Sequence, residues 1–299
     1  MVGVQNLQLG WQPALALAAA LAVGAAGAPV LARQRGPAIR PYLRESAIVA
    51  ALYGLWQLAA SVSVAGSSGA FARGRWIVRF EHGWLPSERD LQRVLAHHEL
   101  LTRAANWYYA AMHFTALGIL LLWLFARHRA AYPRVRTVLV LLTASSLLIQ
   151  LVPVAPPRLL PDLGFVDTAA RYGESVYAIS GITVDQLSAM PSVHVGWALL
   201  VGWAVVSVGS SRYRWLVLAH PAITVFVVVA TANHFWLDGI VAAVLLAVSI
   251  AAVRLAERLL AGPDHRHAGG AGTGHAGQRA GDPVQADRAG DELVGPQRT

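Results

Sequence analysis

One acidic residue, Asp238, interrupts an apolar stretch that is otherwise long enough to cross a lipid bilayer. An unpaired charge there costs about 2.5 to 3.5 kcal/mol on insertion scales, so an intramembrane carboxylate indicates a functional site. His234 lies four residues earlier, which on a helix places both side chains on one face. The carboxylate can orient the imidazole and leave its other nitrogen as a nucleophile or base, as in a catalytic triad. The alternative is a buried pair in which the two side chains only satisfy each other's hydrogen-bonding needs.

A second group of reactive side chains opens another apolar stretch, at Met190, Pro191, Ser192, Val193 and His194. We expect Pro191 at the first helical position and Ser192 beside the free amides of the first turn. Such a helix start binds phosphate oxygens, and His194 can give a proton to a leaving oxygen. The alternative is a capping serine next to an interfacial histidine.

A third candidate is Arg158, which ends the run Pro153, Val154, Ala155, Pro156, Pro157, Arg158. Two adjacent prolines predict an extended and rigid exit from the preceding apolar stretch, so that the guanidinium is held in place. Arginine suits bidentate binding of phosphate. The alternative is an interfacial anchor that follows a proline stop.

A polar stripe is predicted on a further apolar helix, where Glu99, Asn106 and His113 recur every seven residues and Tyr109 lies close to the same face. Seven-residue spacing superposes side chains to within about 20° on a helix. The stripe can line a cavity that receives a polyol or sugar head group. It can equally form hydrogen bonds to neighbouring helices.

These elements belong to a chain of 299 residues with a mean hydropathy of +0.48, of which only 13% are charged. Soluble domains usually carry about a quarter charged residues. The pattern predicts an all-α polytopic membrane bundle of about seven spans, a six-helix core and one N-terminal helix. The expected spans are 14–32, 46–66, 105–126, 137–154, 191–209, 214–232 and 235–254. Residues 215–253 would measure about 58 Å as one helix, so we predict a tight reversal near Thr231, Ala232 and Asn233.

Three regions follow from composition. Residues 1–45 hold the N-terminal span and an Arg-rich loop, residues 46–258 form the membrane core, and residues 259–299 are predicted to be a disordered cytoplasmic tail. The absence of cysteine excludes disulfides, thiolate metal sites and cysteine nucleophiles. The net charge of +8 comes from arginines beside the apolar stretches, which favours membrane orientation over nucleic-acid binding.

Arginine clusters in alternate short connections set the predicted orientation, because cationic loops stay in the cytoplasm. The clusters are Arg33, Arg35, Arg40 and Arg44; Arg127, Arg129, Arg134 and Arg136; Arg212 and Arg214; and Arg254 and Arg258. The connection 155–190 is acidic and fits the outer side, whereas 67–104 fits less well, with six Arg against four acids. In this second connection Ser87 and Asp90 predict the start of an interfacial helix, with Leu91, Val94, Leu95, His98 and Leu101 on one face.

The order and spacing of these motifs resemble the type-2 phosphatidic acid phosphatase superfamily, over roughly residues 46–255. Residues 191–194 and 234–238 are similar to its second and third signature motifs. Residues 155–158 and the Asn233-His234 form of the third motif are more similar to the inositolphosphotransferase branch, which includes inositol phosphorylceramide synthases.

The resemblance implies the roles of the site residues. His234 would attack phosphorus to form a phosphohistidine, Asp238 would orient it, His194 would protonate the leaving group, and Ser192 would bind phosphate oxygens. Two cationic ligands of the phosphatase branch are missing, because the chain has no lysine and Val228 stands where that branch has an arginine. Arg158 and Arg171 are left to supply the charge, which favours the transferase branch.

The expected protein is a multi-pass enzyme of the cell membrane, with its active site outside the cytoplasm and its C-terminus inside. It would act on a phospholipid or polyprenyl phosphate, with an alcohol as acceptor and without metal or other cofactor. Hydrolysis of phosphatidate or polyprenyl phosphates is the alternative reaction. Four histidines in or near spans, His113, His194, His220 and His234, also leave open a haem-binding protein, and a non-catalytic scaffold or transporter is a further alternative.

Overall fold

Backbone amides have no water to bind inside lipid, and a helix pairs all of them within one segment. The computed structural model of the protein accordingly holds helices and loops, without a β-strand, in the residues that it describes: 10–31, 36–63, 69–174 and 186–261. The long helices are α1 (Trp11–Leu31), α2 (Gly36–Ser63), α5 (Glu99–Arg127), α6 (Tyr132–Gln150), α9 (Val193–Val208), α10 (Ala219–Ala230) and α11 (Trp236–Leu260). Three shorter helices are α3 (Ala70–Glu81), α4 (Glu88–Ala96) and α7 (Thr168–Arg171). The predicted all-α membrane bundle is confirmed.

Five helices are long and apolar enough to span a bilayer. They are α1, α5, α6, α11 and the segment Arg212–Ala230, in which a 3-10 turn (η4, Arg212–Leu218) leads into α10. The apolar helix α9 has 16 residues, or about 24 Å, and is shorter than a typical span. Helix α2 carries Arg40, Arg44 and Glu45 in its first half and is not in this group. Each of the seven predicted spans coincides with a helical segment. That all seven cross the membrane stays a prediction.

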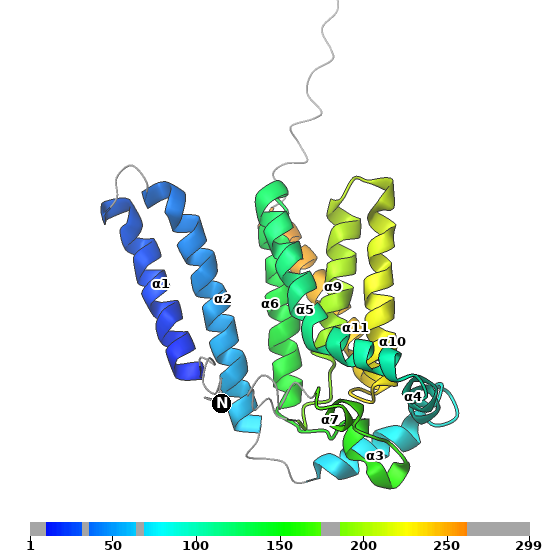
Figure 1. Ribbon diagram of the computed structural model, residues 1–299. Helices are drawn as coiled ribbons and strands as arrows, with labels where there is room; N and C mark the ends of the chain where they lie inside the picture. The colour runs from blue at the N-terminus through cyan, green and yellow to red at the C-terminus, as the bar shows by residue number, and fades with distance from the viewer. Residues whose placement is uncertain (1–9, 32–35, 64–68, 175–185, 262–299) are drawn as a thin grey trace, which may run out of the picture. The chain divides into compact units, whose positions relative to one another are not determined.

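The core that positions the site is built by α5, α6, α9 and α11. Leu124, Val138, Leu142 and Leu200 are buried there and pack together. Figure 1 shows α5, α6, α9 and α10 running side by side. Because side chains of α5, α6, α9 and α11 share this cluster, α9 and α11 are held by packing as well as by their connecting loops.

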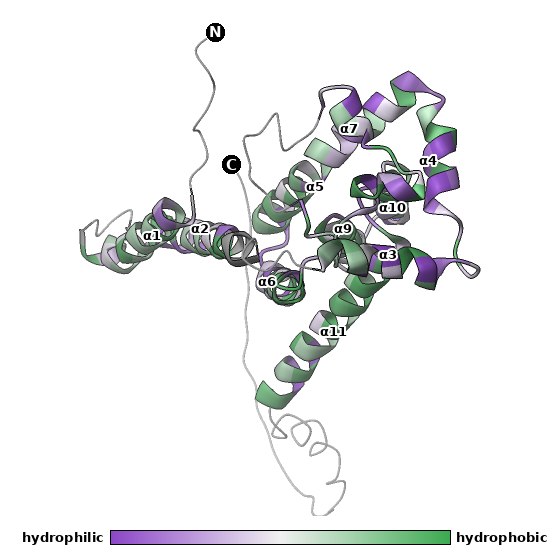
Figure 2. Cartoon of the chain, turned by 90° about the horizontal axis from the view of Figure 1, so that it is seen from below, coloured by the Kyte–Doolittle hydropathy of each residue, from purple (hydrophilic) through white to green (hydrophobic). Residues whose placement is uncertain are grey.

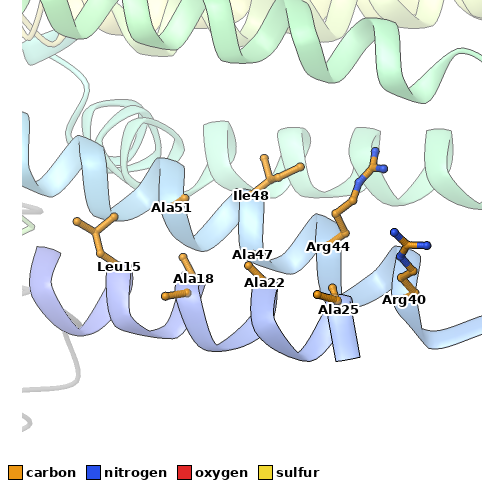
Figure 3. Close-up of a pocket in the computed structure, with 11 residues that line it drawn as sticks. Leu15, Ala18, Ala22, Ala25, Arg40, Arg44, Ala47, Ile48 and Ala51 are labelled. Carbon is orange, nitrogen blue, oxygen red and sulfur yellow. The ribbon is translucent and has the colours of Figure 1, made fainter. Parts of the chain in front are cut away.

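Helices α1 and α2 pack against each other, and one polar cluster ties α2 to α6. Glu45 accepts a hydrogen bond from Tyr132 over 3.2 Å and pairs with Arg136. A pocket of about 570 Å³ lies between α1 and α2 (Figure 3). It is lined mainly by alanines, with Arg40 and Arg44 at one end, and holds none of the motif residues.

The short helices α3, α4 and α7 gather at the end of the bundle where α9 and α11 begin (Figure 1). Figure 2 shows that α4 is largely hydrophilic, whereas α11 is mainly hydrophobic. Helix α3 lies against the loop after α6, because a Cβ on Gly74 would come within 2.6 Å of the carbonyl oxygen of Ala155. Only glycine permits this approach.

The two local sequence predictions in this region have different outcomes. The reversal is confirmed, since α10 ends at Ala230 and α11 begins at Trp236, with Ala232 in the left-handed region at φ 55°. The helix after Pro86 also forms, with Ser87 as its N-cap, but it ends at Ala96, and its interfacial position stays a prediction. The predicted apolar face of residues 91–101 is therefore wrong in part, because it is divided between α4 and α5. The predicted tail, residues 259–299, lies outside the described residues from position 262 onward.

Candidate active site

Three segments meet where α9 and α11 begin. The backbone N–H of Ser192 donates to the carbonyl oxygen of Asp238 over 3.2 Å, and that of Arg158 donates to Ala232 over 2.8 Å. These bonds join the start of α9, the loop after α6 and the reversal before α11. The structure thus brings the three motif segments together.

His234 is held in one orientation by two acceptors. Its Nδ1 lies 2.8 Å from the carbonyl oxygen of Ala189 and 3.2 Å from Oδ2 of Asp238. Since both partners accept, Nδ1 carries the ring proton and Nε2 keeps its lone pair. Among the described residues, the buried Nε2 has no hydrogen-bond partner. This is the arrangement that a nucleophilic imidazole requires.

The contact between His234 and Asp238 has a different geometry from the predicted one. His234 precedes α11, so the two side chains do not share a helical face. Asp238 lies in the first turn of α11, and its Oδ2 accepts the N–H of Phe235 over 2.9 Å as well as Nδ1 of His234. The carboxylate therefore caps the helix start and orients the imidazole at once.

His194 lies in the first turn of α9 among aromatic rings. Tyr109 of α5 stacks on it, with ring centroids 4.2 Å apart and planes at 19°. The ring centroids of His113 and His234 lie 4.1 and 5.6 Å from that of His194. The rings of the expected acid and the expected nucleophile are therefore near neighbours.

Ser192 is the N-cap of α9, and its Oγ accepts the N–H of Val195 over 3.3 Å. The predicted place of Pro191 at the first helical position is wrong, because the helix begins at Val193 and Pro191 precedes the cap. The hydroxyl of Ser192 uses a lone pair for capping and keeps its proton for donation. The free amides of α9 face the same end of the bundle as His234.

Arg158 is buried, and its Nε donates to Oδ1 of Asn233 over 2.9 Å. Its Nη1 lies 3.4 Å from Oδ2 of Asp167, the N-cap of α7. The expected extended exit is only partly correct: Pro156 is extended, but Arg158 sits in a 3-10 turn (η2, Pro157–Leu159). The guanidinium is nevertheless fixed next to the residue that precedes His234.

The polar stripe of α5 divides between two surroundings. Asn106 is buried and contacts Thr168 over 3.1 Å and Glu174 over 3.1 Å, so it anchors α7. His113 and Tyr109 instead contact His194. The structure therefore shows hydrogen bonding for one part of the stripe and proximity to the motif histidines for the other.

Two predicted substrate ligands lie away from this centre. Glu99 is exposed and pairs with Arg103 over 3.5 Å, within the first turns of α5. Arg171 is exposed at the end of α7. Neither side chain is brought to His234 by the described structure, so both stay predictions that need a substrate to test.

The histidines of the described residues form no metal cluster, and two of them lie too close together for a haem. The described part of the chain contains no group of three His, Cys, Asp or Glu side chains that could hold a metal ion. The rings of His113 and His194 touch, which leaves no room for a porphyrin between them. His220 lies elsewhere, hydrogen-bonded through Nδ1 to Tyr108 over 2.8 Å.

Sequence reasoning did not find several groups that shape the site. The carbonyl of Ala189 carries no side-chain signal, and Asp167 gave only the ordinary signal of a helix cap. Glu81 and Glu88 are two of the four acids counted in connection 67–104, and both are buried. Their burial depends on α3 lying against the start of α11 and on α4 packing against α10, which local pattern does not report.

The family comparison agrees with this geometry. The PAP2 superfamily model matches residues 75–252, more than half of the chain, and this range includes all three motif segments. Neither a curated protein nor a solved structure matches the chain significantly. This match does not distinguish the inositolphosphotransferase branch from the other branches. It does confirm the superfamily that the motifs indicated, and the chain belongs to the PAP2 superfamily.

Proposed function

We propose that the protein is a membrane phosphotransferase that takes a phosphoryl or phosphoinositol-type group from a lipid onto His234 and passes it to an alcohol. Membership of the PAP2 superfamily supports the coarser part of this statement, a phosphatase or phosphotransferase that acts on lipid phosphates. The inositolphosphotransferase-like specificity is our proposal.

The orientation of His234 is the observation that carries the proposal. With Nδ1 held by Ala189 and Asp238, Nε2 presents its lone pair to a phosphorus atom without further reorganisation. As the Nε2–P bond forms and the bond from phosphorus to the lipid oxygen breaks, positive charge develops on the imidazole. The carboxylate of Asp238 stabilises that charge, which is why a buried acid is useful here.

His194 would supply the proton that the leaving oxygen requires. In the first step it protonates the departing lipid alkoxide; in the second it removes the proton from the incoming alcohol, whose oxygen attacks phosphorus and breaks the Nε2–P bond. The proton is thus returned and the enzyme regenerated. The stacked ring of Tyr109 restricts the imidazole of His194 to a small range of orientations.

The positive charge available for phosphate is limited, and this favours a diester. Arg158 is the arginine fixed at the reversal, and in the described structure it already faces Asp167. The amides at the start of α9 and the hydroxyl of Ser192 add neutral donors. A phosphodiester brings one negative charge and a monoester up to two, so the site matches a phospholipid diester better.

The proposed orientation places this site on the extracytoplasmic face of the cell membrane, with the C-terminus in the cytoplasm. The alternating arginine clusters support it. Because the chain has no cysteine, single cysteines at exposed Val166 and exposed Tyr213 can be labelled separately with a membrane-impermeant maleimide. Labelling from outside is expected at position 166 alone, and labelling at 213 alone would reverse the orientation.

The reaction is tested with purified protein in lipid nanodiscs and phosphate-labelled phosphatidylinositol or phosphatidate, with and without a lipid alcohol. Transfer predicts label in a new lipid that depends on the alcohol, and hydrolysis predicts label in a water-soluble product. His234→Ala should abolish both products. His220→Ala is the matched control, because this histidine lies outside the site and contacts Tyr108. Equal turnover by His234→Ala and the parent would refute the proposal.

A further inference from the structure

Two buried carboxyl groups lie directly behind the candidate site and have no part in the steps above. Glu81 ends α3 and Glu88 begins α4, and their exposed fractions are 1% and 5%. Buried glutamates are rare unless they are paired or protonated. Two of them side by side call for a physical explanation.

The two groups face each other, and each has an atom without a partner. After burial itself, the hydrogen bonding and charge of Glu88 act most strongly on Glu81. Glu81 Oε2 and Glu88 Oε1 are buried, and neither has a hydrogen-bond partner among the described residues. Two carboxylates cannot satisfy each other, because both only accept. One proton held between them provides the missing donor.

The electrostatic surroundings favour that proton. Burial, followed by the hydrogen bond to Glu88 and its charge, raises the pKa of Glu81 to about 9, and the Leu237 amide only partly opposes this. The charged groups acting on Glu81 are Glu88 from α4 and Asp238 from α11, with the imidazole of His234 beyond Asp238. Near neutral pH the pair therefore carries one negative charge instead of two.

Glu81 also makes a direct contact with the start of α11. Its Oε1 accepts the backbone N–H of Leu237 over 2.6 Å. Leu237 precedes Asp238, so this bond fixes the first turn that holds the orienting carboxylate. α3 therefore supplies a cap to α11 from outside the helix, at the point where the orientation of His234 is set.

We propose that Glu81 and Glu88 hold one shared proton and act as positioning residues for His234 and Asp238, so that loss of this proton switches the enzyme off at alkaline pH. A second negative charge behind Asp238 would repel its carboxylate and loosen the first turn of α11. This inference rests on the proposed function only in its kinetic test, because that test measures kcat of the proposed reaction.

The kinetic test compares Glu81→Gln and Glu88→Gln with Glu257→Gln, an exposed acid on α11 far along the chain from the site. One group with a pKa of about 9 keeps its proton in about one molecule in ten at pH 10, so parent kcat should fall about tenfold between pH 7 and pH 10. Glutamine supplies a donor and removes the shared proton, so both site variants should lose much less. KM should change little, because positioning acts on the chemical step. An unchanged alkaline loss in both variants would overturn the proposal.

A protein-only measurement separates this inference from the proposed function. The infrared band of a protonated carboxyl should be present in the parent at pH 7 and disappear as pH rises through about 9. In Glu88→Gln it should disappear at lower pH, because burial still raises the pKa of Glu81 but the hydrogen bond and charge of Glu88 are gone. Its absence from the parent at pH 7 would refute the shared proton. The expected band without any phosphohistidine in the parent would instead refute the function and leave the acidic pair standing.

Discussion

Replacing Asp238 by Asn tests how much of the catalysis depends on a charge behind His234. The substitution keeps the shape of the side chain. The N–H of Phe235 needs an acceptor, so the asparagine oxygen should take the place of Oδ2 and still face Nδ1 of His234. The amide nitrogen then takes the place of Oδ1, which has no partner in the described structure. Geometry is retained and the charge is lost.

The magnitude follows from the separation of the charges. The ring nitrogen and the carboxylate oxygen are 3.2 Å apart. Charge centres about 4 Å apart at an effective dielectric of about 20 interact by about 4 kcal/mol, and each 1.4 kcal/mol of barrier is about tenfold in rate. In a serine protease the analogous change costs about 10⁴ in turnover because the imidazole takes the wrong tautomer. Here Ala189 still accepts from Nδ1, so we expect a loss of about 10² to 10³.

The assay is a rapid quench with labelled lipid, followed by counting of acid-labile, base-stable label on the protein. Asp238→Asn should accumulate phosphohistidine slowly, and His234→Ala should accumulate none. His194→Ala should still accept label from an activated aryl phosphate whose leaving group needs no proton. A loss in Asp238→Asn as complete as in His234→Ala would refute the role given to Ala189. Label in His234→Ala but not in His194→Ala would reverse the two histidine assignments.

Four further substitutions or deletions give direct tests. Arg158→Lys keeps a charge but loses the planar fork that reaches Asn233, so kcat/KM should fall at least about tenfold with insertion unchanged; equal activity would return Arg158 to an anchoring role. Ser192→Asp still caps α9 but places a carboxylate where phosphate is proposed to bind, so thermal stability should persist while activity is lost. Gly74→Ala should lower stability by about 1 to 3 kcal/mol, measured by thermal unfolding in detergent, because its Cβ would meet Ala155. Removal of residues 263–299, predicted from composition not to fold, should leave turnover nearly unchanged, and a tenfold loss with normal insertion would contradict that prediction.

The helices could be predicted from sequence because lipid imposes a length and an apolar character on each of them. The reversal after α10 followed from the same length argument. Its backbone did not: Ala232 has a positive φ, which alanine rarely adopts. The conformation is held by long-range contacts, since the carbonyl of Ala232 accepts from Arg158 and Asn233 accepts from the same arginine. No pattern within residues 231–235 contains that information.

The candidate site was predictable where a residue type is unusual for its surroundings. Asp238 stood out as a charge in an apolar stretch, and His234 followed as a nearby partner. Glu81 gave no such signal, because an acid in a polar connection is ordinary. Its bond to Leu237 joins residues 156 positions apart. Periodicity reports only neighbours along one helix, so a contact of this kind emerges only when α3 is packed against α11.

The arginine count that fitted poorly in connection 67–104 has a structural explanation. Arg75 pairs with Asp162 over 2.8 Å and Arg103 with Glu174 over 2.7 Å, so the described parts of this connection and of 155–190 are joined by ion pairs. Taken together, the two connections hold eight arginines and eight acids. Counting short loops one by one assumes that each faces water independently, and ion pairs join these two. Two of the arginines that weakened the count are therefore paired with acids of the other connection, and the proposed extracytoplasmic site rests on the arginine clusters of the alternate connections.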